Sequence, residues 1–184
     1  REDESIIENA YDFLQCFFRS SIDIIFREID NNYRSLGKKM IYCVLMMDME
    51  YGWSKWKIDK PYEQQVKEMR EFINKNNVPV LPFLAVDPRR PNVENIFKQA
   101  FSEDEENPFP FFGIKVYPSL GYLPTDKKLM RIYAECEKYS IPVTAHCGSA
   151  IVRELNKTYD FIPFLGAIKA NRRNDPQNWK KVLD

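Results

Sequence analysis

Four continuous apolar runs divide this chain, and segments of mixed polarity separate them. The runs cover residues 38–48, 78–87, 111–118 and 141–148. Continuous apolar runs of this length are typical of strands that are buried on both faces, as in a parallel sheet. Pro79 and Pro82 weaken the prediction for the second run, because proline donates no hydrogen bond to a neighbouring strand. Pro79 is still compatible with the start of a strand.

Apolar residues recur at helical spacing around these runs. The segments with this pattern are 4–35, 62–77, 92–101, 126–139 and 174–184. Thr125 or Asp126 is a suitable N-cap for the fourth segment, and Asp175 before Pro176 predicts the start of the last one. Residues 149–174 match no single pattern, and we expect a short helix and irregular chain there.

The alternation of strand and helix predicts the fold class. Each segment between two runs is long enough to return the chain to a parallel neighbour. We therefore expect an α/β fold in which the four runs form adjacent parallel strands, in chain order, with flanking helices. A length of 184 residues suits one domain or part of a larger one.

Composition excludes two classes of partner. Lys and Arg number 27, as do Asp and Glu, and no basic patch is evident, so we expect no nucleic-acid partner. No apolar run approaches the ~18 residues of a membrane span, so we expect no membrane partner. Four widely spaced cysteines in apolar surroundings predict buried thiols and a reducing, cytoplasmic location; they are Cys16, Cys43, Cys136 and Cys147.

Polar side chains mark the carboxyl ends of the four predicted strands, where parallel α/β folds bind their ligands. They are Asp48, Asp87 with the following Arg89, Lys115, and His146. Side-chain alternation places Lys115 with Tyr117 on one face of the third strand, opposite Ile114 and Val116. It places His146 on one face of the fourth strand, opposite Cys147. We expect Lys115 and His146 to share the concave face of the sheet.

The residues alone leave two interpretations of these groups open. His146 is the only histidine in the chain, and it is either a packed, hydrogen-bonded side chain or a ligand. Lys115 either reaches solvent or pairs with a carboxylate, or it serves a site.

Four segments occur in an order that resembles the amidohydrolase superfamily of metal-dependent hydrolases. They are PFLAVDPRRPN (82–92), GIKVYPSLGYLPTD (113–126), LMRIYAECEKYSIPV (129–143) and HCGSA (146–150). The resemblance covers residues 38–148 and is greatest to the branch related to aminocarboxymuconate-semialdehyde decarboxylase. It implies a distorted TIM (β/α)8 barrel with a divalent metal at its top. Residues 1–184 then form a single incomplete TIM-barrel-like domain with about strands two to five, without the first and later strands.

The resemblance also implies roles for individual residues. His146 matches the histidine that ends the family's fifth strand and binds the metal, most simply Zn²⁺. Lys115 matches a position that in some members carries a carboxylated lysine; here it is expected to bind substrate, together with Tyr117 and Arg89. No catalytic role is implied for the strand-end acids. The chain departs from the family pattern because it has no His-x-His strand to supply two further ligands.

The expected function is hydrolysis of a C–N or C–O bond in a small organic substrate through a metal-activated water. One alternative is a metal-dependent decarboxylase of the same superfamily. Another is a non-catalytic binding protein on a barrel that has lost its metal site. The chain alone is expected to be inactive. Aromatic-rich segments at 51–62 and 107–113 are expected to line a substrate entrance, to form a homodimer interface or to pack around the barrel rim.

Overall fold

The structure is a computed structural model that describes residues 21–51, 60–76, 79–102, 111–147 and 175–183. Several predictions concern residues outside these ranges: the first part of the 4–35 helix, Cys16, the segment 149–174, and most of the aromatic-rich segments 51–62 and 107–113. A homodimer interface and a cytoplasmic location stay predictions. Among the described residues, no helix has the length and apolar character needed to cross a membrane.

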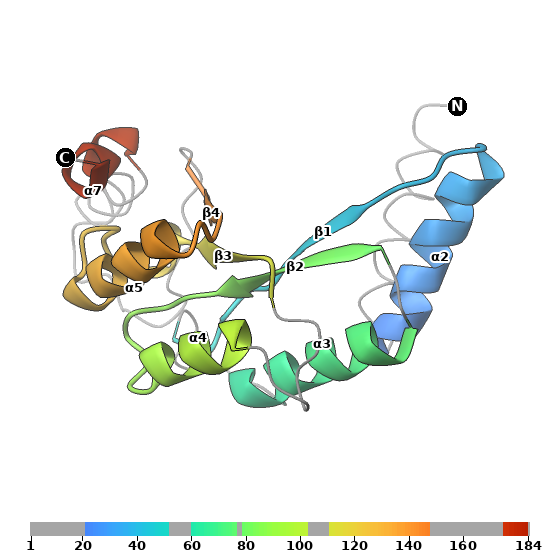
Figure 1. Cartoon of the computed structure of the whole chain (residues 1–184), viewed down its shortest axis with the longest axis horizontal. Coiled ribbons are helices and arrows are strands. Elements are labelled where there is room, and N and C mark those ends of the chain that lie inside the picture. The colour runs from blue at the N-terminus through green and yellow to red at the C-terminus, as the bar shows by residue number, and fades with distance from the viewer. Residues whose placement is uncertain (1–20, 52–59, 77–78, 103–110, 148–174, 184) are drawn as a thin grey trace, which may run out of the picture.

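Four parallel strands form one curled sheet, and they lie side by side in chain order. The strands are β1 (Tyr42–Leu45), β2 (Val80–Ala85), β3 (Gly113–Val116) and β4 (Val143–Ala145). Each pairs in parallel with the next along the chain. The sheet curls as half of a barrel does, with helices along its outer side (Figure 1). The predicted α/β class, strand order and parallel pairing are confirmed.

The helices also follow the predicted segments. They are α2 (Ile22–Ser35), α3 (Tyr62–Asn76), α4 (Val93–Phe101) and α5 (Lys127–Lys138). Asp126 caps α5, since its carboxylate accepts a hydrogen bond from the Lys128 amide at 2.8 Å. The last segment begins as predicted, with Asp175 as its cap, but its first turn is the 3₁₀ turn η2 (Pro176–Trp179), and α7 (Lys180–Leu183) follows.

The two prolines of the second run fit the sheet by accepting hydrogen bonds. The Pro79 carbonyl, one residue before β2, accepts from the Tyr42 amide at 2.8 Å. The Pro82 carbonyl, inside β2, accepts from the Phe112 amide at 2.8 Å. Proline therefore contributes its acceptor to the sheet although it has no donor.

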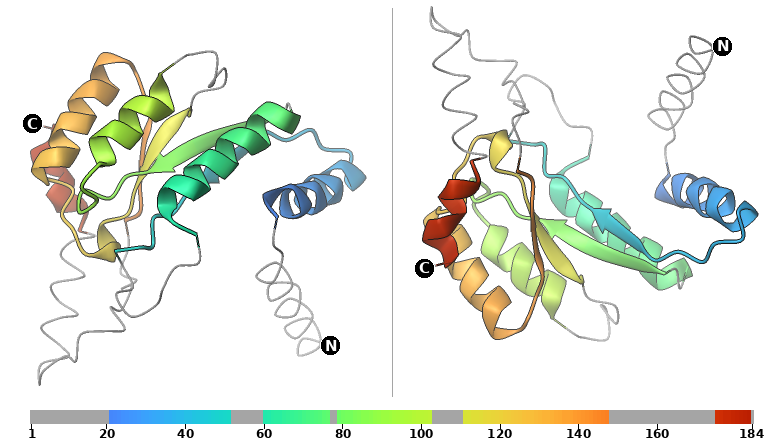
Figure 2. Two further views of the ribbon diagram at one scale, coloured as in Figure 1. Left: turned by 90° about the horizontal axis from the view of Figure 1, so that it is seen from below. Right: turned by 90° about the horizontal axis from the view of Figure 1, so that it is seen from above.

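The hydrophobic core lies between the outer face of the sheet and the helices (Figure 2). Leu84, Ile114 and Val116 point to this side and are fully buried. The apolar stripes of α3, α4 and α5 cover them, as helical spacing predicts. The prediction of buried thiols holds for Cys136, but it is wrong for Cys43 and Cys147, which are exposed.

Gly113, at the start of β3, has no room for a side chain. A Cβ at this position would lie 2.5 Å from the Phe83 ring and 2.7 Å from the Pro142 carbonyl oxygen. Because backbone on one side and a buried ring on the other must then move, we expect Gly113→Ala to destabilise the fold by about 1–3 kcal/mol. Urea unfolding measures this. Gly37→Asn is the control, since Gly37 has open space and asparagine tolerates its positive φ; equal unfolding midpoints for Gly113→Ala and wild type would contradict the expectation.

Candidate functional site at the carboxyl ends of the strands

The predicted strand-end residues come together at one end of the sheet. Asp48, Asp87, Lys115 and Tyr117 line one cavity of about 10 Å³, which has room for about one water molecule. His146 adjoins this group, since its ring lies 4.3 Å from the Tyr117 ring, centroid to centroid. The prediction that these side chains share one end of the sheet is confirmed.

The register of β3 and β4 explains why Lys115 and His146 share a face. Lys115 pairs with Thr144, and continuation of the parallel register sets Tyr117 beside His146. Ile114 faces the helices instead and is fully buried. The predicted alternation therefore holds through β3 and β4.

Cys147 was expected on the face opposite His146. Its thiol is exposed, and the residue lies beyond the end of β4 at Ala145. Its placement on the opposite face stays a prediction.

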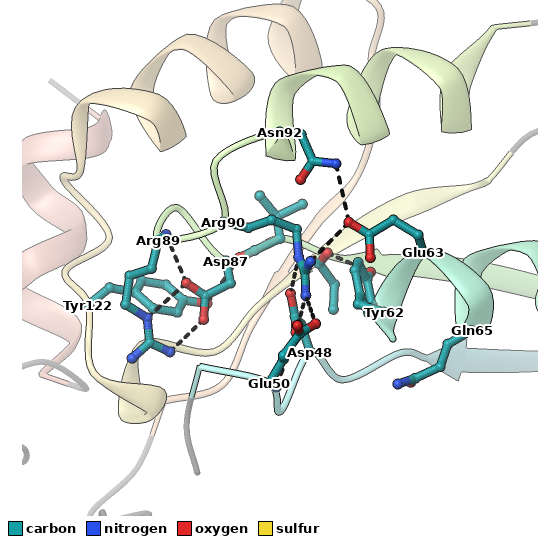
Figure 3. Close-up of polar contacts among 12 residues, drawn as sticks. Asp48, Glu50, Tyr62, Glu63, Gln65, Asp87, Arg89, Arg90, Asn92 and Tyr122 are labelled. Atoms are coloured by element: carbon teal, nitrogen blue, oxygen red, sulfur yellow. Dashed lines mark hydrogen bonds and ion pairs between the residues drawn. The ribbon is translucent and has the colours of Figure 1, made fainter. Parts of the chain in front are cut away.

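Asp48, which follows β1, is bound by a residue that the sequence analysis did not single out. Arg90 donates to the two Asp48 carboxylate oxygens, from Nε at 2.8 Å and from Nη2 at 3.0 Å (Figure 3). Nη2 also bonds Glu50 at 2.5 Å, and Nη1 bonds Glu63 at 3.0 Å. Arg90 and Asp48 are only 4% and 2% exposed as side chains. One buried guanidinium thus joins the end of β1 to the start of α3.

Two aromatic rings, from different segments of the chain, lie beside the Arg90 guanidinium. Its Cζ lies 5.1 Å from the Tyr51 ring centroid and 5.0 Å from that of Tyr62. Burial disfavours the charge, but the hydrogen bonds to Asp48 and Glu50 outweigh burial and raise the pKa of Arg90. Arg90 therefore stays charged in this site.

Asp87, which follows β2, is bound in the same way by Arg89. Its carboxylate accepts from the Arg89 amide at 2.9 Å, from Nε at 2.9 Å and from Nη2 at 2.6 Å. The Arg89 guanidinium also lies 5.5 Å from the Tyr122 ring centroid (Figure 3). The predicted substrate-binding residue Arg89 therefore already has a buried carboxylate partner.

Two buried phenols join the strand ends to their surroundings. Tyr122 accepts from the Tyr117 amide at 2.6 Å and donates to the Val86 carbonyl at 3.1 Å, which connects the ends of β3 and β2. Tyr62 donates to the Ala85 carbonyl at 2.7 Å. Burial raises the pKa of both phenols, so they remain donors at neutral pH.

Lys115 differs from these residues because it is buried without a polar partner. It is 9% exposed, and no hydrogen bond or ion pair reaches its Nζ from the part of the chain that the structure describes. Its nearest charge-stabilising feature is the Tyr117 ring, with the centroid 5.9 Å from Nζ. Burial lowers the pKa of Lys115, against the opposing effect of Cys147. Lys115 therefore has no polar partner among the described residues, and its burial disfavours the charged form.

This cost predicts a stability gain on removal of the amine. Because the folded pKa of Lys115 is lowered, the unfolded chain binds more protons between that pKa and about 10.5. Wild-type stability should therefore rise with pH in this window. We expect Lys115→Met to be more stable than wild type, with a gain that is greatest below the folded pKa and shrinks as the pH approaches 10.5.

Urea unfolding at a series of pH values from 7 to 10 measures this difference. Lys67→Met on the exposed face of α3 is the matched control and should show no such trend. A gain for Lys115→Met that does not change with pH would contradict the assignment of its cost to the buried charge.

The described residues bring no complete set of metal ligands together. No group of three or more His, Cys, Asp or Glu side chains that could hold a metal occurs among them. The half-buried His146 imidazole makes no polar side-chain contact within the described ranges. Asp48 and Asp87 are held by arginines. A zinc site takes at least three protein ligands, and His146 could supply only one of them.

Comparisons with known proteins do not add to this picture: no family model, no curated protein and no solved structure matches the chain. The functional conclusion therefore depends on the strand-end residues and their geometry.

Proposed function

We propose that this chain forms part of a metal-dependent hydrolase of the amidohydrolase type, with its site at the carboxyl ends of β1–β4. The observation that carries the proposal is the placement of Lys115, Tyr117 and His146 together on the inner face of a curled parallel sheet. Parallel (β/α) folds bind substrates at this end of the sheet. Completion of a TIM barrel by further strands is part of the proposal.

Each residue of this group has a distinct role in the proposal. His146 binds a divalent metal, preferentially Zn²⁺, through its imidazole. When bound, such a metal lowers the pKa of its water ligand and polarises the scissile carbonyl. Tyr117 packs against the imidazole and limits its rotation. Lys115 binds an anionic group of a small organic substrate, because its ammonium has no other partner in the described residues.

The unpaired Lys115 also favours the second candidate, a decarboxylase. A substrate carboxylate would satisfy the buried ammonium with a charge-assisted hydrogen bond. In that case the C–C bond between the substrate and this carboxylate breaks, carbon dioxide leaves, and the electron pair left on the substrate carbon takes up a proton from water. If no metal binds, the same lysine supports a non-catalytic binding protein for small anions.

Turnover by the full-length natural protein separates these candidates. The protein is stripped of metal with a chelator, supplied with Zn²⁺, and assayed on carboxylated amides, lactones and unsaturated acids. Zinc-dependent formation of a new carboxylate supports the hydrolase, and release of carbon dioxide supports the decarboxylase. Ligand binding without turnover at any metal concentration would favour the binding protein and contradict the proposed hydrolase.

A further inference from the structure

We propose that Arg90 is a positioning residue that keeps Asp48 away from Lys115, so that the lysine stays available for an anionic ligand. This inference rests on the proposed anion-binding role of Lys115. Arg89 acts on Asp87 in the same sense. The two arginines thus determine whether Lys115 is a free cation at the strand ends or is paired with an aspartate.

The two aspartates share a cavity with Lys115. Asp48, Asp87 and Lys115 all line the gap of about 10 Å³ at the strand ends. A buried ammonium and a buried carboxylate attract each other strongly, since little water screens them. Without competing partners, one of the aspartates is expected to turn to Lys115.

Both aspartates are already paired with arginines. Arg90 bonds both oxygens of Asp48, and Arg89 bonds both oxygens of Asp87. No hydrogen bond or ion pair joins either aspartate to Lys115 among the described residues. Two acids that line the same cavity are therefore paired with arginines and not with the amine.

Further hydrogen bonds hold Arg90 itself in place. Its remaining donors bond Glu50 and Glu63, and its backbone carbonyl accepts from Lys128 of α5 at 3.0 Å. Asn92, one residue before α4, donates to the same Glu63 oxygen at 3.2 Å (Figure 3). Because these contacts fix the Arg90 guanidinium, it cannot move with Asp48 toward Lys115. Lysine has no planar fork of donors and could not replace it.

Malonate, a small dicarboxylate, is the probe that tests this inference. Its affinity for the full-length protein is measured by calorimetry and by the shift of the Lys115 Nζ signal in ¹⁵N-lysine NMR, which Lys115→Met identifies. We expect Arg90→Gln to weaken malonate binding at least about tenfold, because the released Asp48 pairs with Lys115. The double variant Asp48→Asn with Arg90→Gln should regain the wild-type affinity within about threefold.

Arg131→Gln, which breaks the exposed Arg131–Glu94 pair, is the control and should bind malonate as wild type does. Circular dichroism establishes which variants fold. If Arg90→Gln does not fold, the folded double variant decides: normal affinity supports the inference, and lost affinity overturns it. Unchanged affinity in folded Arg90→Gln also overturns it. Absence of a malonate effect on Lys115 in wild type would instead refute the anion-binding role in the proposed function.

Discussion

Arg90→Gln is expected to lower the free energy of unfolding by about 3–5 kcal/mol. The reason is that Asp48, with 2% of its side chain exposed, would lose the only cation bonded to it among the described residues. Glu50 and Glu63 would lose the same partner, and the aromatic contacts to Tyr51 and Tyr62 would weaken. Urea unfolding followed by circular dichroism measures the change.

The exposed ion pair of Arg131 and Glu94 provides the matched control. Their side chains are 61% and 40% exposed, so Arg131→Gln should cost less than about 1 kcal/mol. Adding Asp48→Asn to Arg90→Gln should recover part of the loss, since position 48 then no longer carries a buried charge that has lost its Arg90 partner. An Arg90→Gln variant no less stable than Arg131→Gln would show that the Arg90 cluster does not hold the strand ends.

His146→Ala is expected to reduce zinc affinity of the full-length protein by more than about 100-fold and to abolish most of its activity. Even residues that only support a metal ligand typically cost 10–100-fold in affinity, and His146 is proposed as a ligand itself. Its stability should change little, because the half-buried imidazole contacts Tyr117 and makes no polar side-chain contact in the described residues. Metal analysis, activity assays and thermal unfolding measure the three quantities.

Thr144→Val is the control for this substitution, since Thr144 lies in β4, two residues before His146. It should keep zinc affinity at the wild-type level. Unchanged zinc content with a lower melting temperature in His146→Ala would show that His146 is a structural residue and not a ligand.

Most of the sheet could be predicted because each strand lies in a continuous apolar run, although only β2 and β3 are buried on both faces. The run 38–48 was nevertheless longer than β1, which covers Tyr42–Leu45. Exposure could not be read from such a run: Cys43 and Leu45 are exposed, whereas the fully buried Ile114 lies in a run of the same character. Local composition does not show whether a strand lies at the edge or the centre of a sheet.

The position of the candidate site was predicted, but the ion pairs among its side chains were not. Lys115, Tyr117 and His146 follow from strand ends and alternation, which are local properties. Arg90 was missed because it meets Asp48 across 42 positions, a pairing that no periodicity reveals. The signal that could have found it is the pair of arginines that follows a buried acid after one proline in VDPRRPN. Asp48 and Asp87 lie at the strand ends as predicted, but their arginine partners give them a structural role.

The most direct test of the proposed site is the ¹⁵N spectrum of the histidine ring during a Zn²⁺ titration of the full-length protein. The difference from His146→Ala identifies the signals of this one imidazole, the only histidine of residues 1–184. The proposal predicts that one ring nitrogen shifts on zinc addition and that the shift is complete at one equivalent, since the imidazole then binds the metal. Unshifted His146 nitrogens at stoichiometric zinc would contradict it.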